Sequence, residues 1–283
     1  MPVLSIVACE MLEDELVHVL SIDHDIRQLY LVEDTNSFRL TRKLKSRGMR
    51  PFIFPFDRLS AIVMENSRNL FSEGILRFPK FSIFKKIHYA LKAGKCDHLI
   101  IVVNLLPKDL HADTDRLHSE VYRNARDMAK FSDGILLFYG KCAYSYESKT
   151  KLKSLDCPVY FLKDNNSEVV EDCISTALGG NDAYTKTDQL GKGVFYATPM
   201  WITYMKERIK PDRPSNDYNY LNDPNYSHLF KINRLDSDNA DFSINASEFA
   251  KTFDMDIINI NGTMKIAIDS YMNAKLAVCK DSD

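Results

Sequence analysis

Short apolar runs that alternate with helix-like segments constrain this chain more than any other feature of its sequence. The runs are bounded by turn residues, and they recur from the N-terminus to about residue 210. The predicted strands are Leu4–Ala8, Gln28–Val32, Phe52–Phe54, Leu99–Val103, Ile135–Phe138 and Pro158–Leu162. Because strands that alternate with helices are joined by crossover connections, the pattern predicts an α/β fold. We expect a mostly parallel sheet flanked by helices on both faces.

The composition changes part-way along the chain and suggests a domain boundary. The α/β core is predicted to span residues 1–210, and its two series of strands could form similar halves, residues 1–97 and 98–210. After Pro211 the chain becomes rich in Asn, Asp, Tyr and Pro, which favour turns. We therefore expect residues 211–283 to form a turn-rich, irregular extension that ends in one strand and one helix.

Charge and hydropathy exclude two classes of partner. The chain has 37 Lys and Arg against 39 Asp and Glu, a net charge of −2, which leaves no electrostatic footprint for nucleic acid. Basic residues gather over Arg39–Arg50, which we interpret as the solvated face of a helix. No apolar run approaches the roughly 18 residues of a membrane span. The sequence thus predicts neither nucleic-acid nor membrane binding, and it leaves the oligomeric state open.

Three of the six cysteines follow predicted strands. Cys9 comes directly after the first strand, Cys142 follows Ile135–Phe138 through a Tyr-Gly-Lys turn, and Cys173 lies beyond the last strand of the core. Functional groups of a parallel α/β sheet collect outside the carboxyl ends of its strands, so these thiols could share one edge. A buried cysteine is often a small hydrophobic residue, and each one alone could be that. Their joint placement indicates a metal or thiolate site.

The other three cysteines lie elsewhere in the predicted fold. Cys96 and Cys157 precede strands, at the opposite edge of the sheet, and Cys279 is in the C-terminal tail. No two cysteines have the close spacing of a disulfide framework. We therefore expect six free thiols and a cytoplasmic location.

Residues near the three strand-end cysteines complete the predicted site. Glu171 and Asp172 directly precede Cys173, and carboxylates are reasonable zinc ligands or partners of ligands. Gly140 would let the chain turn tightly after a buried strand. The predicted metal ligands are Cys9, Cys142, Cys173 and Glu171, and the predicted cofactor-binding residues are Tyr139, Gly140 and Trp201.

Three further aromatic side chains leave alternatives open. Trp201, the only tryptophan, could be a core residue or a wall of a ligand site. His111 and His118 flank the start of a predicted helix, and for both we favour a surface position. Catalytic residues are not assigned from the sequence.

An ordered set of short motifs resembles a known family. The motifs are Leu106-Pro-Lys-Asp-Leu-His111, Tyr139-Gly-Lys-Cys142, Asp172-Cys173-Ile174, Leu178-Gly-Gly180 with Tyr184, and Tyr196-Ala-Thr-Pro-Met-Trp201. In this order they resemble the uncharacterised family called domain of unknown function 1638, of methanogenic archaea and anaerobic bacteria. The opening Ala8-Cys9-Glu10 is also similar. The resemblance covers roughly residues 3 to 210.

The resemblance carries expectations about function but no established activity. Members often accompany corrinoid-dependent methyl-transfer systems, which implies methyl transfer or one-carbon metabolism, with corrinoid held only by a partner such as a corrinoid protein or a methyltransferase. Where the family commonly has histidine before Asp-Cys, this chain has Glu171.

Two hypotheses of different classes follow. The first is a zinc–thiolate protein in which zinc holds a thiol substrate as thiolate, the nucleophilic form. The alternative is a non-catalytic accessory protein that binds a cofactor or a partner, or a subunit of a larger enzyme complex. Whether the chain is an enzyme is left open by its sequence.

Overall fold

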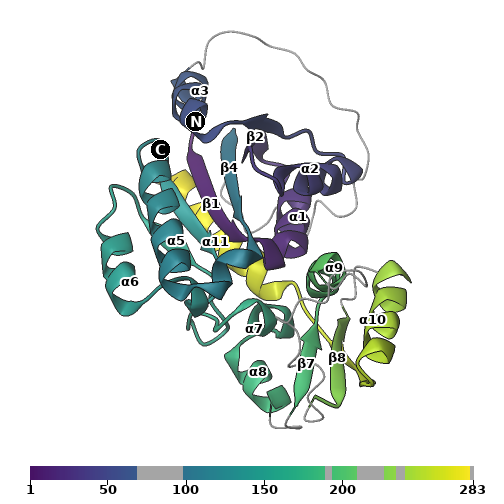
Figure 1. Ribbon diagram of the computed structural model, residues 1–283. Coiled ribbons are helices and arrows are strands. Elements are labelled where there is room, and N and C mark those ends of the chain that lie inside the picture. Colours follow the sequence, from purple (N-terminus) through teal and green to yellow (C-terminus); the bar gives the residue numbers. More distant parts are fainter. Residues whose placement is uncertain (69–97, 189–192, 209–225, 234–239, 281–283) are drawn as a thin grey trace.

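The computed structural model describes residues 1–68, 98–188, 193–208, 226–233 and 240–280 (Figure 1). These residues form a six-stranded sheet and a separate three-stranded sheet. All pairs between neighbouring strands of both sheets are parallel. The predicted α/β fold with a mostly parallel sheet is therefore confirmed.

The larger sheet has the strand order β3-β2-β4-β1-β5-β6. Its strands are β1 (Val3–Cys9), β2 (Ile26–Val32), β3 (Phe52–Phe54), β4 (Leu99–Leu106), β5 (Gly134–Phe138) and β6 (Val159–Phe161). Every residue of the three central strands, β1, β4 and β5, is buried. Strands buried on both faces need continuous apolar runs, which is why these strands were readable from the sequence.

Helices cover both faces of the larger sheet, as predicted. On one face, α11 contacts β1, β5 and β6, and it packs beside α1, which in turn contacts α2. On the other face α5 contacts β1 and β5 and packs against α6 (Figure 1). The bounds are α1 (Glu13–Ile22), α2 (Ser37–Ser46), α5 (Thr114–Ala129), α6 (Tyr146–Lys153) and α11 (Lys265–Lys280). A further helix, α3 (Phe56–Arg68), follows β3.

The two predicted halves do not form separate units. The first three strands do not stay together, because β4, the first strand of the second series, lies between β2 and β1. This insertion places the ends of β1 and β4 side by side, although about ninety residues separate these strands in the sequence.

The smaller sheet spans the predicted boundary at residue 210. Its strands are β7 (Val194–Ala197), β8 (His228–Asn233) and β9 (Asp256–Asn261), so residues on both sides of that boundary pair directly. Four helices belong to this region: α7 (Cys173–Leu178), α8 (Asn181–Asp188), α9 (Pro199–Arg208) and α10 (Ala240–Thr252). Buried side chains of α9 and α10 pack on one face of this sheet, and those of α7 pack on the other.

The C-terminal part of the chain contains the predicted final strand and helix, and also two elements that its composition did not predict. The part of residues 211–283 that the structure describes contains two strands and two helices, of which β9 and α11 were expected. Asn and Asp favour turns locally, but Leu229 and Ile232 of β8 lie in the hydrophobic clusters that hold the sheet between its helices. Burial of apolar side chains on both faces of β8 thus outweighs the preference of the neighbouring Asn and Asp residues for turns.

The smaller sheet lies beyond the carboxyl ends of the larger sheet's strands (Figure 1). The contact is made by α9, which packs on α1 and on η1 (Glu10–Leu12), the short 3₁₀ helix that follows β1. Elements from the C-terminal part of the chain thus cover the edge at which the sequence predicted a site.

A buried ion cluster fastens α11 to the opposite edge. Lys275 Nζ donates to Asp23 Oδ1 at 2.6 Å and to Asp25 Oδ2 at 2.7 Å, and Tyr271 Oη donates to Asp23 Oδ2 at 2.6 Å. The side chains of Lys275 and Asp23 are each 2% exposed. A charge buried this deeply is tolerated only because its partner is present.

This cluster yields a stability prediction. Asp23→Ala leaves the ammonium of Lys275 buried with one partly exposed partner, so it should lower the free energy of unfolding by about 3 kcal/mol. Asp25→Ala is the matched control, because the Asp25 side chain is 39% exposed and its loss should cost less. Urea unfolding of both variants measures the difference. Equal losses would contradict the assigned role of Asp23.

Candidate thiol site at the carboxyl edge of the larger sheet

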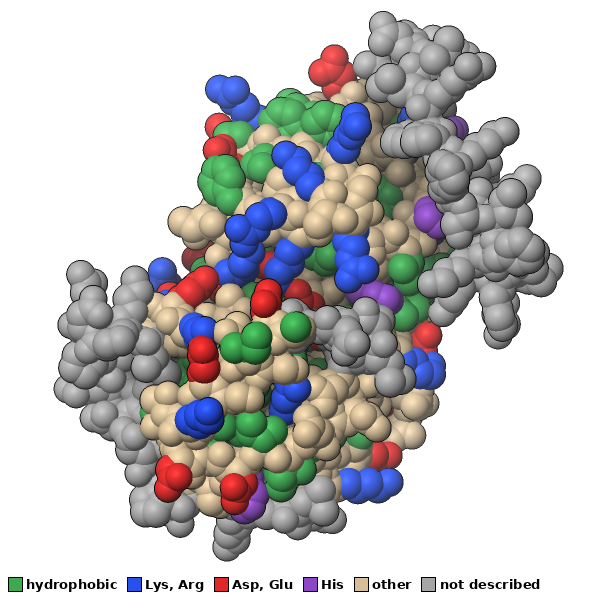
Figure 2. All heavy atoms as spheres, turned by 90° about the vertical axis from the view of Figure 1, so that its right-hand side faces the viewer, with side chains coloured by type: hydrophobic (Ala, Val, Ile, Leu, Met, Phe, Trp, Pro, Cys, Tyr) green, Lys and Arg blue, Asp and Glu red, His purple; other side chains and the backbone are tan. Residues whose placement is uncertain are grey.

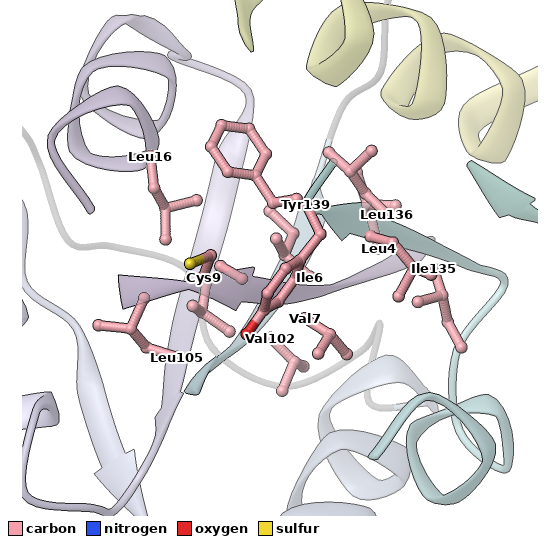
Figure 3. Packing of buried hydrophobic residues seen from close by; sticks show 14 of the residues in the cluster. Leu4, Ile6, Val7, Cys9, Leu16, Val102, Leu105, Ile135, Leu136 and Tyr139 are labelled. Atoms are coloured by element: carbon pink, nitrogen blue, oxygen red, sulfur yellow. The ribbon is translucent and has the colours of Figure 1, made fainter. Parts of the chain in front are cut away.

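Strand register brings the first cysteine to the end of β5. Ala8 of β1 pairs with Phe138 of β5, and Cys9, the last residue of β1, pairs with Leu106 of β4. Cys9 therefore lies next to Tyr139, the residue that follows β5. Both are buried at the end of the hydrophobic core, among side chains of β1, β4 and β5 (Figure 3).

Backbone contacts bring Cys142 to the segment that precedes Cys173. The Lys141 amide donates to Val170 O at 2.8 Å, and the Cys142 amide donates to Glu171 O at 3.3 Å. A Cβ on Gly140 would lie 2.5 Å from both Asp172 N and Glu171 O. The close approach of these two segments therefore requires glycine at position 140, which is a structural reason for the residue that the sequence assigned to a cofactor.

A capping box fixes the backbone at Cys173. The Asp172 side chain accepts from the Ile174 and Ser175 amides, and Ser175 Oγ accepts from the Asp172 amide. Cys173 is consequently the first residue of α7. Because its carboxylate already caps α7, Asp172 serves the site by orienting Cys173.

The three thiols influence one another electrostatically. Burial raises the pKa of Cys9 well above its usual value, and the charge of Cys142 raises this pKa further. Burial, Asp172 and then Cys9 and Cys142 raise the pKa of Cys173. Burial and Asp172 raise the pKa of Cys142 to about 11. Cys9, Cys142 and Cys173 therefore lie within electrostatic reach of one another.

Each of these cysteines has a buried, unpaired polar group as a neighbour. Tyr139 Oη, Tyr144 Oη and Trp201 Nε1 have no hydrogen-bond partner among the described residues. Tyr139 lies beside Cys9, Trp201 beside Cys173, and Tyr144 within electrostatic reach of Cys142. A neutral thiol is a weak acceptor, so contact with the Cys9 and Cys173 sulfurs leaves the Tyr139 and Trp201 donors poorly satisfied. An unpaired buried donor is costly, so these three groups indicate a missing acceptor.

The structure places Glu171 away from the thiols. Its carboxylate pairs with Lys141 at 2.6 Å, and both side chains are nearly half exposed. In the described part of the chain, no three His, Cys, Asp or Glu side chains are arranged to hold a metal ion as they stand. The donor atoms nevertheless suit zinc, because three thiols from three segments face buried donors that would stabilise them as thiolates.

Trp201 stands where the hydrophobic clusters of both sheets meet. Its ring packs edge-on against Phe195 and Tyr204, with centroids 5.9 and 6.0 Å away. Lys108 Nζ lies 5.0 Å from the Trp201 ring centroid. Trp201 is therefore a packing residue that also borders Cys173, and its role as a wall of a ligand site stays a prediction.

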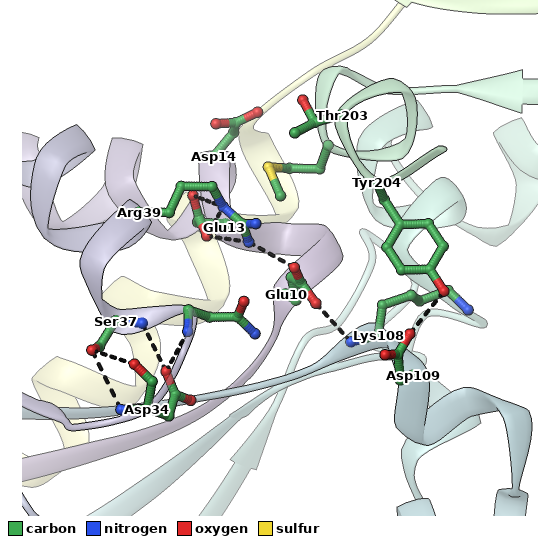
Figure 4. Close-up of polar contacts among 12 residues, drawn as sticks. Glu10, Glu13, Asp14, Asp34, Ser37, Arg39, Lys108, Asp109, Thr203 and Tyr204 are labelled. Atoms are coloured by element: carbon green, nitrogen blue, oxygen red, sulfur yellow. Dashed lines mark hydrogen bonds and ion pairs between the residues drawn. The ribbon is translucent and has the colours of Figure 1, made fainter. Parts of the chain in front are cut away.

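An acidic residue next to Cys9 forms part of the site and was not assigned from the sequence. Glu10 Oε2 accepts from the Lys108 amide at 2.8 Å, and Glu10 Oε1 accepts from Arg39 at 2.8 Å (Figure 4). Arg39 also donates to Glu13, which is fully buried. Glu10 thereby joins the loop after β1 to the loop after β4, and these loops belong to adjacent strands.

His111 lies at the site rather than in the exposed position we favoured. It is half-buried, its ring stacks on Tyr139 with centroids 6.2 Å apart, and Nδ1 lies 3.2 Å from Lys108 O. His118 Nε2 lies 3.3 Å from Cys142 O. Both histidines follow β4, which lies next to β1 in the sheet. The sequence does not show this strand order, so it could not show that these two residues lie near this site.

The basic stretch on α2 divides into two groups. Arg42, Lys45, Arg47 and Arg50 are exposed, as expected for a solvated helix face. In Figure 2, Lys and Arg side chains gather on the upper half of the face that α2 helps to form. Arg39 and Lys43 instead pair with acidic residues of the segment that follows β1.

Of the other cysteines, one differs from the expectation of a free thiol. Cys157 is a free thiol before β6, at the amino edge as predicted. Cys279 is disulfide-bonded, so the expectation of six free thiols is wrong for this residue. Sequence spacing could not reveal this, because a disulfide depends on which residues α11 meets in space. Cys96 lies outside the described residues.

Comparison with known proteins identifies the family. The family described as "Protein of unknown function (DUF1638)" matches residues 105–271, more than half of the chain. The chain belongs to this family. No curated protein and no solved structure matches it. Among the described residues, no helix is long and apolar enough to cross a membrane.

The DUF1638 match covers most of the site. Lys108, His111, Cys142, Cys173 and Trp201 fall inside the matched segment, whereas β1 lies before it. The match continues through β8, α10 and β9, beyond the region of the resemblance seen in the sequence. The whole smaller sheet therefore lies inside the matched segment.

The close approach of Gly140 to the backbone of residues 171 and 172 yields a stability prediction. Gly140→Ala puts a methyl group against the backbone of residues 171 and 172, so it should lower the free energy of unfolding by about 1–3 kcal/mol through overpacking. Lys141→Ala is the control, because it removes only an exposed ion pair worth less than about 1 kcal/mol. Chemical denaturation measures both, and equal stability of wild type and Gly140→Ala would contradict the close approach.

His111 predicts a pH dependence. Burial, and then the charge of Lys108, lower the pKa of His111 to about 4. The unfolded chain, with a histidine pKa of about 6.5, then binds the proton more readily, so stability should fall as pH decreases from about 6.5 towards 4. His111→Gln should reduce this slope. Titration of the His111 ring by NMR checks the pKa directly, and a midpoint near 6.5 would contradict the burial.

Proposed function

We propose that this chain is a metal–thiolate protein whose thiolates, Cys9, Cys142 and Cys173, bind zinc. The observation that carries the proposal is that three cysteines from three separate segments lie within electrostatic reach of one another, near buried polar groups that have no partner among the described residues. Packing alone would favour apolar neighbours around a buried cysteine, because an unsatisfied hydroxyl or indole N–H costs free energy.

The donors would act when the thiols lose their protons. A thiolate accepts hydrogen bonds far better than a thiol, so Tyr139 Oη and Trp201 Nε1 would each gain an acceptor beside them. Such donors around metal-bound sulfur orient the ligands and tune their basicity. The half-buried ammonium of Lys108, which favours the thiolate forms of Cys9 and Cys142, would offset the added negative charge.

Bringing the sulfurs onto one metal requires only local movement in this proposal. Thiolates at about 2.3 Å from a tetrahedral zinc lie roughly 3.5–4 Å from one another. A cysteine sulfur can approach a common centre by rotation about its Cα–Cβ bond while the backbone contacts of residues 140–142 and 170–173 remain. Glu171 has no part in this ligand set, because its carboxylate is directed to Lys141.

Three protein ligands leave a fourth position for a substrate. Zinc bound in this way lowers the pKa of a coordinated thiol and presents it as a nucleophilic thiolate. We propose one-carbon or methyl transfer to that thiolate, with a corrinoid protein or a methyltransferase as the partner that presents the group. This part of the proposal rests on the association of the family with such systems.

A cytoplasmic location belongs to the same proposal. Three adjacent thiols persist best in a reducing compartment, and the four cysteines Cys9, Cys142, Cys157 and Cys173 are free. The disulfide of Cys279 is the observation that weighs against this location.

Metal content tests the proposal. Protein purified without oxygen should bind zinc, and cobalt substituted for it should give the intense thiolate-to-cobalt charge-transfer absorption. Cys142→Ser should abolish stoichiometric binding and this absorption, because it removes one of three sulfurs. Cys157→Ser is the matched control, since it is the same change at a free cysteine of the opposite edge. Unchanged cobalt absorption in Cys142→Ser, or no metal binding by wild type, would refute the zinc site.

A further inference from the structure

One cation at the thiol site, Lys108, has no acidic partner within the described ranges of the chain. Among the residues that the structure describes, no carboxylate lies within ion-pair distance of Lys108 Nζ. Its basic neighbours are all compensated: Arg208 pairs with Asp109, and Arg39 and Lys43 pair with acidic residues of the segment after β1. Half-buried charges usually have a partner, so an uncompensated ammonium indicates that its counter-ion is a ligand.

The Lys108 side chain is held in place by two aromatic rings. Its Nζ lies 5.0 Å from the ring centroid of Trp201 and 5.9 Å from that of Tyr204. Tyr204 is fixed in turn by a 2.9 Å hydrogen bond from its hydroxyl to Asp109. Cation–π contacts orient the ammonium and leave its hydrogen-bond donors unused. The group is thus ordered before any ligand binds.

The backbone of Lys108 is tied to the residue that follows Cys9. Its amide donates to Glu10 Oε2 at 2.8 Å, and Glu10 is only 6% exposed. The ammonium acts on both Cys9 and Cys142, whose thiolate forms it favours. One rigid loop therefore holds a positive charge within electrostatic reach of two of the three thiols.

We propose that Lys108 binds an acidic group of the substrate, so that the ligand of this site is a small thiol that also carries a carboxylate or another anionic group. The inference rests on the proposed zinc–thiolate site, where the substrate sulfur would take the fourth metal position. The acidic group would then pair with Lys108 Nζ, beside the unpaired N–H of Trp201. Charge-assisted hydrogen bonds of this kind give both affinity and orientation.

The test compares two thiols that differ only in charge. Cobalt-substituted wild type would be titrated with 3-mercaptopropionate and with its neutral amide, 3-mercaptopropanamide, and binding followed by the change in cobalt absorption. The acidic thiol should bind about tenfold more tightly than the amide, which corresponds to about 1.4 kcal/mol. Lys108→Gln should remove this preference, and Lys108→Arg should retain most of it.

Lys149→Gln is the matched control. Lys149 is also half-buried over two aromatic rings, Tyr144 and Phe161, but it is not among the charges that act on the cysteines. This variant should keep the full preference. Comparing the ratio of the two affinities between variants cancels the different intrinsic basicities of the two thiols.

The outcomes separate the two proposals. If cobalt binds with thiolate absorption but wild type holds both thiols equally, or if Lys108→Gln keeps the preference, the acidic-substrate inference is overturned while the metal site stands. Lys108 would then serve only as a counter-ion of the protein's own thiolates. Failure of wild type to bind cobalt would overturn both.

Discussion

The site depends on the position of β1 between β4 and β5. This strand is buried along its whole length, and its parallel register with both neighbours sets where each of the three chain segments leaves the sheet. Cys9, Leu106 and Phe138 therefore end their strands at one level. A register shift by one residue would turn every side chain of β1 to the other face, so the hydrophobic core and the thiol site are specified by the same pairing.

Buried charges at this edge follow two different rules. Glu13 has no exposed side-chain surface, and the ion pairs with Arg39 and Lys43 compensate it fully. Burial would lower the pKa of Arg39, but the hydrogen bonds and charges of Glu13 and Glu10 raise it above its usual value. These pairs hold α2 against the segment after β1. Lys108 lies on the other side of Glu10 and has no such partner in the part of the chain that the structure describes, and this contrast supports the proposal that its charge is available to a ligand.

The smaller sheet completes the site because its helices carry Trp201 and Cys173 to the carboxyl edge of the larger sheet. Trp201 belongs to α9, which packs on η1 and α1, and Cys173 begins the helix that covers the other face of the same sheet. The chain then ends in α11, which crosses back to the larger sheet and is anchored by Lys275. Neither sheet is therefore independent of the residues beyond 210, and the family match over residues 105–271 includes all of the smaller sheet and part of the larger one.

Much of the fold and part of the site were accessible from the sequence. Strands buried on both faces leave continuous apolar runs, so β1, β4 and β5 were identified, and the carboxyl-edge rule for parallel sheets then grouped Cys9, Cys142 and Cys173. The same reasoning failed for β8 and α10, where the turn-forming residues around them concealed the apolar residues Leu229 and Ile232, which are buried on opposite faces of β8. Composition reports local preference, whereas burial between two layers of helices is a property of the assembled molecule.

Only the tertiary structure decided which neighbours the thiols have. The sequence placed Glu171 beside Cys173, but backbone direction sends that carboxylate to Lys141, on the surface. It could not show that β4 inserts next to β1, so Lys108 and His111 could not be distinguished from exposed residues of a loop. The sequence by itself determined the parallel α/β architecture and the edge at which the thiols gather, because those follow from local apolar periodicity. The order of the strands and the direction of each side chain required the packed structure, because they depend on contacts between residues far apart in the chain.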